Sequence, residues 1–350
     1  MGLVNLMNLN LAETESLVKD LGEPKYRAKQ IYSWVHQKGV TQLREMTDLP
    51  AGLRQKLQTV CTPGGLDIIT QRVSKDGTVK YLFGLSDGNA VESVFLPHGY
   101  GKGVCVSSQV GCRMGCRFCA STVHGLVRNL SAGEIYAQVM EIQRLAGVRI
   151  DSIVIMGSGE PMDNLAEVLK FIGLITSPDG LHIGARHITV STCGVVPGIV
   201  ELAREDTQIT LSVSLHATND EIRDRLMPIN KKYPIGVLMD ACRQYVAETN
   251  RRVTFEYALI NRFNDAPEYA RELGLLLKGM LCHVILIPLN QVAERDYERS
   301  EPARVRGFRE GLRSAGIPVT VRKEMGGDID AACGQLRHRI TAESVWPGRR

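Results

Sequence analysis

The sequence predicts an α/β protein whose core is a partial barrel of parallel strands that alternate with helices. The first reason is that short apolar segments of strand length recur from residue 104 onward, separated by helical stretches such as 131–145 and 164–175. This alternation is typical of a parallel sheet with right-handed crossovers. The second reason is that the chain supplies six such units, too few for a closed eight-stranded barrel. The predicted strands are 104–106, 153–156, 188–191, 209–214, 253–257 and 284–287.

Residues 1–60 predict a separate helical accessory domain. Asn10 precedes an apolar residue and stands three positions before Glu13, which is the pattern of a capped helix start, and Gly22 and Pro24 break that helix. Apolar residues at helical spacing then continue to residue 60. Two interpretations stay open for the basic side chains of this part, contacts with phosphates or an ordinary solvated face. They are Lys25, Arg27, Lys29 and Lys38.

Residues 61–100 predict a β-rich linker built around hairpins. Alternating segments at 79–83 and 90–96 are separated by turn signals, of which Asp76-Gly77 and Asp87-Gly88 are the clearest. A glycine-rich stretch at 99–103 marks the junction to the core domain. We therefore expect the core domain to cover residues 101–345.

Composition narrows the class of protein. The chain of 350 residues is 44% hydrophobic, and its apolar runs are far shorter than the roughly 18 residues of a membrane span. Its nine cysteines are an odd number in a large, well-cored chain without a secretion signal, so we expect a reducing cytoplasm, and a monomer by default. Lys and Arg exceed Asp and Glu by 42 to 38, and residues 303–350 hold ten basic against five acidic residues. This balance is compatible with nucleic acid but does not require it.

Three cysteines, Cys112, Cys116 and Cys119, form a C-x3-C-x2-C motif with Phe118 before the last of them. Three thiolates from one loop can bind three irons of a four-iron four-sulfur cluster and leave the fourth iron open, whereas a structural zinc site needs four protein ligands. Buried cysteines without a metal, and a zinc site completed by a distant ligand, remain alternatives.

Polar residues follow four of the predicted strands, where ligands of parallel α/β folds gather. Each would be ordinary turn chemistry by itself, but four such ends beside a cysteine loop favour a bound cofactor. These residues are Gly159 and Glu160, Ser191, Ser214 to His216, and Asn290. Glu160 offers a carboxylate to an ammonium group. Far from the loop, Cys333 lies in a stretch of small residues, where a buried thiol is the simplest interpretation.

The cysteine motif resembles that of the radical S-adenosylmethionine superfamily. Longer segments resemble the RlmN and Cfr family of RNA adenine methyltransferases over nearly the whole chain, and they are 105–112, 156–161, 227–230 and 328–336. The resemblance implies a radical S-adenosylmethionine barrel, one 4Fe-4S cluster, S-adenosylmethionine, an RNA-binding N-terminal domain, and an external electron donor such as flavodoxin or ferredoxin.

The resemblance also implies a role for each matching residue. The cluster ligands would be Cys112, Cys116 and Cys119, and the S-adenosylmethionine site would be lined by Gly159, Glu160, Ser191, Ser214, Leu215, His216 and Asn290. Cys333 would carry the methyl group as S-methylcysteine, and Cys105 would resolve the protein–RNA link through a transient disulfide. Glu92 would be a proton acceptor, and Met156 would lie near the reacting thiol.

Within this family the motifs favour the RlmN branch, which methylates carbon 2 of adenine. Pro161 and residues 219–223 match that branch, whereas carbon 8 methylases of the Cfr type have Ala in place of Pro161. Ser158 departs from the Met common to both. The RlmN pattern implies 23S rRNA at the peptidyl-transferase centre and, in many members, a tRNA anticodon-loop adenine. The alternatives are a Cfr-type enzyme or, in other classes, a metal-binding module or a radical activase of a partner protein.

Overall fold

The N-terminal part of the protein is a helical unit. The computed structural model describes residues 3–336. The α-helices of the unit are α1 (Leu11–Asp20), α2 (Tyr26–His36) and α3 (Ala51–Val60), and its short parallel strands are β1 (Val4–Asn5) and β2 (Cys61–Thr62). The predicted helix start is confirmed, since the Asn10 side chain accepts the N–H of Glu13 while the Glu13 carboxylate accepts the N–H of Asn10.

The core is a ten-stranded sheet in the order β14-β13-β12-β11-β10-β9-β6-β5-β4-β3. Its strands are β3 (Asp67–Val73), β4 (Val79–Gly84), β5 (Ala90–His98), β6 (Gly101–Val106), β9 (Ser152–Ile155), β10 (Ile188–Thr192), β11 (Thr210–Ser214), β12 (Val253–Leu259), β13 (Cys282–Pro288) and β14 (Val319–Val321). The strands from β6 through β9 to β14 run parallel to one another. The six predicted strands correspond to β6 and β9 to β13, so the predicted fold class is confirmed.

The sheet extends beyond the predicted barrel at both edges. Strand β14 adds a further parallel strand beside β13, with Val321 opposite Leu286. Strands β3 to β5 pair antiparallel, and β5 continues into the core sheet through its pairing with β6. The sheet therefore runs without interruption across the boundary predicted after residue 100, and the domain boundaries themselves stay predictions.

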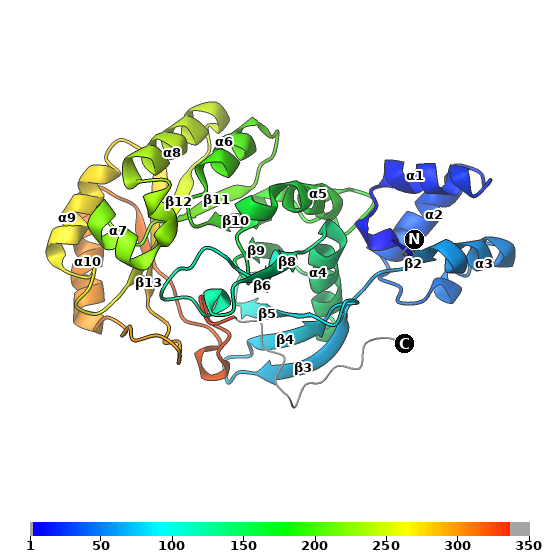
Figure 1. The fold of residues 1–350 in the computed structure, drawn as a ribbon, viewed down its shortest axis with the longest axis horizontal. Coiled ribbons are helices and arrows are strands. Elements are labelled where there is room, and N and C mark those ends of the chain that lie inside the picture. The colour runs from blue at the N-terminus through cyan, green and yellow to red at the C-terminus, as the bar shows by residue number, and fades with distance from the viewer. Residues whose placement is uncertain (1–2, 337–350) are drawn as a thin grey trace.

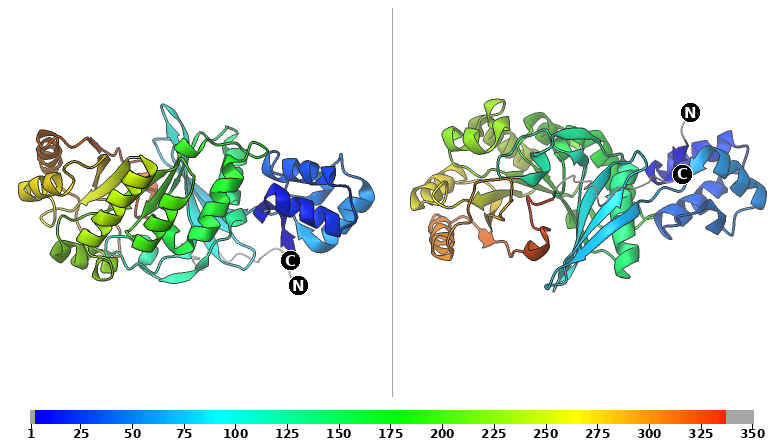
Figure 2. Two further views of the ribbon diagram at one scale, coloured as in Figure 1. Left: turned by 90° about the horizontal axis from the view of Figure 1, so that it is seen from above. Right: turned by 60° about the horizontal axis from the view of Figure 1, so that its bottom comes forward.

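Helices follow the parallel strands and cover the sheet, as Figure 1 and the two views of Figure 2 show. They are α4 (Ala132–Ala146), α5 (Leu165–Thr176), α6 (Val196–Arg204), α7 (Asp220–Leu226), α8 (Ile235–Thr249), α9 (Pro267–Leu276) and α10 (Pro302–Ser314). Burial from both faces explains the sequence of the central strands. All seven residues of β12 are buried and five of them are apolar, as expected for a parallel strand covered on both faces.

The helical unit lies at one end of the elongated molecule and docks on α4 and α5 (Figure 1). The Tyr136 hydroxyl donates to the carbonyl of His36 at 2.7 Å, and the N–H of Gly133 donates to the Asn8 side chain at 2.9 Å. Lys170 on α5 forms an ion pair with Glu13 at 2.8 Å. Because these contacts include buried groups, the unit is held against the core by more than surface charge.

The cysteine loop projects from a small antiparallel pair, β7 (Gln109–Gly111) and β8 (Leu126–Asn129). Residues 326–336, the return segment, pass beside this loop and beside the β3–β4 hairpin, and appear red in Figure 1. The N–H of Ala120 donates to the carbonyl of Gly334 at 2.8 Å, and Ser121 donates to that of Leu336 at 2.6 Å. The last part of the predicted core domain, 337–345, lies outside the described residues. Within residues 3–336 no helix combines the length and apolarity that a membrane crossing needs.

Candidate active site

The three motif cysteines come from one tightly held loop between β7 and β8. The Thr122 hydroxyl bonds to the carbonyls of Cys116 and Cys119 at 3.0 and 3.1 Å, and Arg295 donates to the Cys119 carbonyl at 3.2 Å. The N–H of Cys112 donates to the carbonyl of Gly125 at 2.9 Å. The backbone of the loop is therefore fixed by hydrogen bonds within the loop and from Arg295.

The environment of these thiols fits a cationic metal group. Burial raises the pKa of Cys112 to about 12, and it also raises the pKa of Cys116 and Cys119. Buried thiolates need a neighbouring positive charge, which irons of a cluster supply. In the described part of the chain no three His, Cys, Asp or Glu side chains close around a single-ion site. The donor set of three thiols beside a wide cavity fits a cluster with one open iron.

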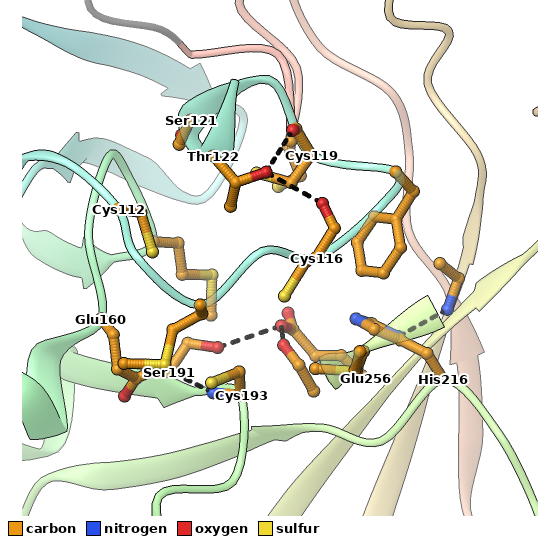
Figure 3. A pocket seen from close by; sticks show the side chains of 18 of the residues that line it. Cys112, Cys116, Cys119, Ser121, Thr122, Glu160, Ser191, Cys193, His216 and Glu256 are labelled. Carbon is orange, nitrogen blue, oxygen red and sulfur yellow. Dashed lines mark hydrogen bonds between the residues drawn. The ribbon is translucent and has the colours of Figure 1, made fainter. Parts of the chain in front are cut away.

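The cysteine loop faces the carboxyl ends of the parallel strands across a cavity, which we call the cluster cavity. Its empty space is about 920 Å³ including the open mouth. Figure 3 shows the loop on one side and residues of the strand ends on the other. The predicted residues that line it are Cys112, Cys116, Cys119, Met156, Gly159, Glu160, Ser191, Ser214, His216, Asn290 and Cys333. The structure thus brings together eleven residues predicted from distant parts of the chain.

Glu160 is held at the floor of the cluster cavity by backbone groups. Its carboxylate accepts the N–H of Cys193 at 2.7 Å and that of Met162 at 3.0 Å, and burial nevertheless raises its pKa. A cationic ligand such as an ammonium group would stabilise the ionised form. The preceding residue, Gly159, has φ +113°, and a Cβ there would lie 2.7 Å from the N atom of Gln109. This position requires glycine.

His216 offers a neutral ring to the same cavity. Burial lowers its pKa to about 3, and its Nδ1 accepts the N–H of Ala258 at 2.9 Å. The proton of the neutral ring is therefore on Nε2, which can donate to a ligand. Leu215 does not line the cavity. It is fully buried, and its N–H donates to the Glu256 carbonyl at 3.0 Å, so it contributes backbone position rather than side-chain contact.

Two charged residues of the cavity were missed by the sequence analysis, Glu256 and Arg322. Glu256 on β12 accepts hydrogen bonds from Ser191 at 3.2 Å and Ser214 at 3.4 Å, as Figure 3 shows for Ser191. Arg322, directly after β14, forms an ion pair with Glu256 at 2.8 Å, and its Nη1 lies 3.0 Å from Sγ of Cys333. The sequence did contain a signal for Glu256, namely a carboxylate inside a strand predicted to be buried. A buried charge costs free energy unless it is paired, so such a residue indicates a partner or a ligand.

A second cavity, the channel, meets the cluster cavity at Cys333. Its empty space is about 1610 Å³, and it is lined by Cys105 as well as Cys333. Met156, Asn290 and Arg322 line both cavities. Both thiols are free in the structure, and burial raises the pKa of Cys105 to about 12. Cys333 therefore stands at the junction between the cluster loop and the second predicted reactive cysteine.

Two of the residues singled out in the sequence lie beside the cavities rather than in them. Glu92 on β5 is buried and pairs with Lys80 at 3.1 Å, and Lys80 also donates to the carbonyl of Asp330 in the return segment at 3.1 Å. Its role as a proton acceptor stays a prediction. Ser158 is 3% exposed and lines neither cavity, and its carbonyl accepts the N–H groups of Ser108 and Gln109. The Ser158 side chain therefore contributes no atom to the lining of either cavity.

Comparisons with known proteins agree with this geometry. Residues 4–62 match the family described as "Ribosomal RNA large subunit methyltransferase N-terminal domain", and residues 106–273 match the radical SAM superfamily. A protein of Desulforamulus reducens named "Probable dual-specificity RNA methyltransferase RlmN" is 55% identical over 97% of this chain and 98% of its own length. A protein of the same name from Pelotomaculum thermopropionicum is 57% identical over 96% of this chain and 92% of its own length.

A solved structure is similar over almost the whole molecule. The crystal structure of a radical SAM methyltransferase from Sphaerobacter thermophilus superimposes with a TM-score of 0.92 at 46% sequence identity. The match covers 95% of this chain and 99% of that one. The helical unit, the ten-stranded sheet and the return segment thus form an arrangement that a known methyltransferase largely shares.

Proposed function

Because the chain belongs to the RlmN family of radical S-adenosylmethionine methyltransferases, we propose that it methylates carbon 2 of an adenine in RNA, with Cys333 as the methyl carrier. The observation that carries this proposal is the position of Cys333, which lines both the cluster cavity and the channel that contains Cys105. The substrates we propose are 23S rRNA and an adenine of the tRNA anticodon loop.

The residues of the cluster cavity suit the two cofactors of this family. Cys112, Cys116 and Cys119 would hold a 4Fe-4S cluster, and the carboxylate of Glu160 would bind the ammonium group of S-adenosylmethionine. Together these groups would supply one-electron chemistry that produces a carbon radical, with the electron coming from an external donor such as flavodoxin or ferredoxin. Polar side chains on neighbouring strand ends would orient the cofactor, and they are Ser191, Ser214, His216 and Asn290.

The need for two cysteines follows from the chemistry of the target atom. Carbon 2 of adenine is a poor nucleophile, so direct transfer from a sulfonium to this carbon would fail. We propose that Cys333 takes up the methyl group as a thioether, and that this carbon, after losing one hydrogen atom to the carbon radical, bonds to carbon 2 of the base. Carbon 2 then loses its proton, and the remaining electron would return to the one-electron chemistry of the cluster. Cys105 attacks Sγ of Cys333, the sulfur–carbon bond breaks with its electron pair on the carbon, which takes a proton, and the two cysteines are left as a disulfide. Both thiols line the channel, which supports Cys333 as the methyl carrier and Cys105 as the thiol that releases the product.

The channel has features that suit an RNA base. Tyr100, which is 88% exposed, stacks on His98 with ring centroids 4.9 Å apart, and both residues line the channel. Lys323 adds a positive charge to the same cavity, in which Arg299 is paired with Glu324. Aromatic rings and cations of this kind stack on unpaired bases and contact phosphates, and an adenine in an RNA loop costs less to extrude than one in a duplex.

Two cysteine variants test this function. Cys333→Ala should abolish methylation of RNA, because the methyl carrier is lost, while Cys105→Ala should trap RNA covalently on Cys333, because only the releasing thiol is lost. Mass spectrometry of the Cys333 peptide should find one added methyl group in the active protein. Digestion of the product RNA should yield 2-methyladenosine. Full turnover by Cys333→Ala would refute the carrier role, and 8-methyladenosine alone would place the chain in the Cfr branch.

A further inference from the structure

The sulfur of Cys333 is in contact with a cation. Nη1 of Arg322 lies 3.0 Å from Sγ of Cys333, and Nη2 lies 3.8 Å from Sδ of Met156. The same Nη2 atom forms the ion pair with Glu256 at 2.8 Å. One guanidinium thus joins a thiol, a thioether and a carboxylate at the place where the two cavities meet.

Arg322 is fixed in this position from several sides. Its N–H donates to the carbonyl of Leu286 at 2.9 Å, directly after the last residue of β14. Glu256 is in turn held by the hydroxyls of Ser191 and Ser214. The guanidinium is therefore oriented by a strand end at one side and by an anchored carboxylate at the other, and its planar fork can serve two partners at once.

From this geometry we propose that Arg322, oriented by Glu256, holds Cys333 as the thiolate that takes the methyl group from S-adenosylmethionine. The proposal rests on the proposed function. In this step Sγ of Cys333 forms a bond to the methyl carbon as the sulfonium–methyl bond breaks. The electron pair of the broken bond stays on the departing sulfur, so S-adenosylhomocysteine leaves and no proton moves.

The charges around Sγ favour this step. A thiolate and the Glu256 carboxylate share one guanidinium, so this buried group carries one net negative charge. A sulfonium in the cluster cavity would neutralise it. After methyl transfer both sulfurs are neutral thioethers, and Arg322 and Glu256 remain as a balanced pair. The electrostatic environment is therefore matched to a sulfonium donor before transfer and to neutral products afterwards.

Alkylation of Cys333 by iodoacetamide tests the proposal without methylation activity, because this reagent reacts with the thiolate. The full chain is produced under iron limitation, and mass spectrometry follows the unmethylated Cys333 peptide separately from the other cysteines. Arg322→Gln should lower the alkylation rate of Cys333 by about tenfold at constant pH. Arg299→Gln is the matched control, because Arg299 also lines the channel but pairs with Glu324, and it should leave this rate unchanged.

A double variant keeps the test valid if the single change disturbs folding. Arg322→Gln leaves Glu256 buried without its cation, whereas Arg322→Gln combined with Glu256→Gln removes both charges and lets the two amides bond to each other. The double variant should show the same slow alkylation with an unchanged melting temperature. Alkylation at the wild-type rate in a folded variant would overturn the proposal. An iron-loaded wild type in which Cys333 never carries a methyl group would instead refute the proposed function.

Discussion

Arg223 shows how one side chain can shape the site without touching a ligand. It is fully buried on α7 and donates to the carbonyls of Cys193 at 2.7 Å and Leu215 at 3.1 Å, and to the Asn230 side chain at 2.9 Å. A further bond of 3.3 Å reaches the Ser214 carbonyl. Arg223 therefore fixes the backbone directly after β10 and at the end of β11, next to Ser214 and His216, two of the residues proposed to orient the cofactor.

Replacing Arg223 by Met should destabilise the protein by about 3–5 kcal/mol, because several buried acceptors would lose their donor. Urea unfolding measures the change. Arg225→Met on the same helix is the control, since Arg225 is exposed and stacks over Phe263 at 4.4 Å, and it should cost less than about 1 kcal/mol. Equal losses in the two variants would show that the buried network contributes nothing of its own.

Residues of the site differ in how far sequence alone could predict them. The three cluster cysteines share one loop, and Glu160 and Ser191 lie at or after the carboxyl ends of strands, which must meet in a parallel sheet, so both sets could be anticipated. The roles of Glu256 and Arg322 could not be predicted in this way, because each role depends on contact with the other residue. Within the sequence Glu256 is one residue of a buried strand and Arg322 follows a strand of three residues, and only the finished sheet places them 2.8 Å apart.

At the scale of elements, the return segment depends on the β3–β4 hairpin for its position. The N–H of Gly326 donates to Asp76 at 3.0 Å, and Ser74 donates to Asp328 at 2.5 Å. Burial opposes ionisation of Asp76, but hydrogen bonds from Thr78, Gly326 and Ser74 outweigh it and lower its pKa to about 2. The carboxylate contacts are thus complete above the unfolded pKa near 4 and are lost only as pH falls toward 2.

Combining Asp76→Ala with Asp328→Ala should loosen the segment that carries Cys333. At neutral pH, tryptic cleavage after Lys323 should become about fivefold faster or more, because local opening costs less free energy. Asp87→Ala provides the control, since Asp87 lies in the next hairpin turn and pairs with Arg128 instead. An unchanged cleavage rate in the double variant would mean that the contacts with the cysteine loop are sufficient to hold the return segment in place.

Short elements explain why the sheet was larger than predicted. Strand β14 has three residues, too few to show periodicity, and its pairing with β13 arises only after α10 has returned the chain to the sheet edge. The hairpin strands β4 and β5 were recognisable from their turns. Their continuation into β6 was not, because pairing between β5 and β6 depends on partners rather than on the local pattern.

For the whole molecule, docking of the helical unit brings His36 into the interior. Its ring stacks on Tyr32 at 4.1 Å and meets Tyr136 of α4 edge-on at 4.9 Å, while Nε2 donates to the Leu9 carbonyl at 3.1 Å. Burial is the main cause that lowers the pKa of His36 to about 4, against the opposing effect of the Leu9 and Leu6 carbonyls. The folded protein therefore keeps this ring neutral at pH 7.

This pKa predicts how acid affects the attachment of the unit. Between about pH 6.5 and 4 the unfolded chain binds a proton at His36 that the folded protein does not, so stability is complete above this range and falls by up to about 3 kcal/mol as pH drops through it. His36→Phe keeps the ring contacts and removes the titrating group, so urea unfolding should depend less on pH over this range. His187→Phe, at an exposed histidine, should keep the wild-type dependence. The contrary result would be that His36→Phe and the wild type lose the same free energy of unfolding between pH 7 and 4. Protonation of His36 would then not weaken the attachment of the helical unit, and protonation of carboxylates elsewhere in the protein would have to account for the whole loss.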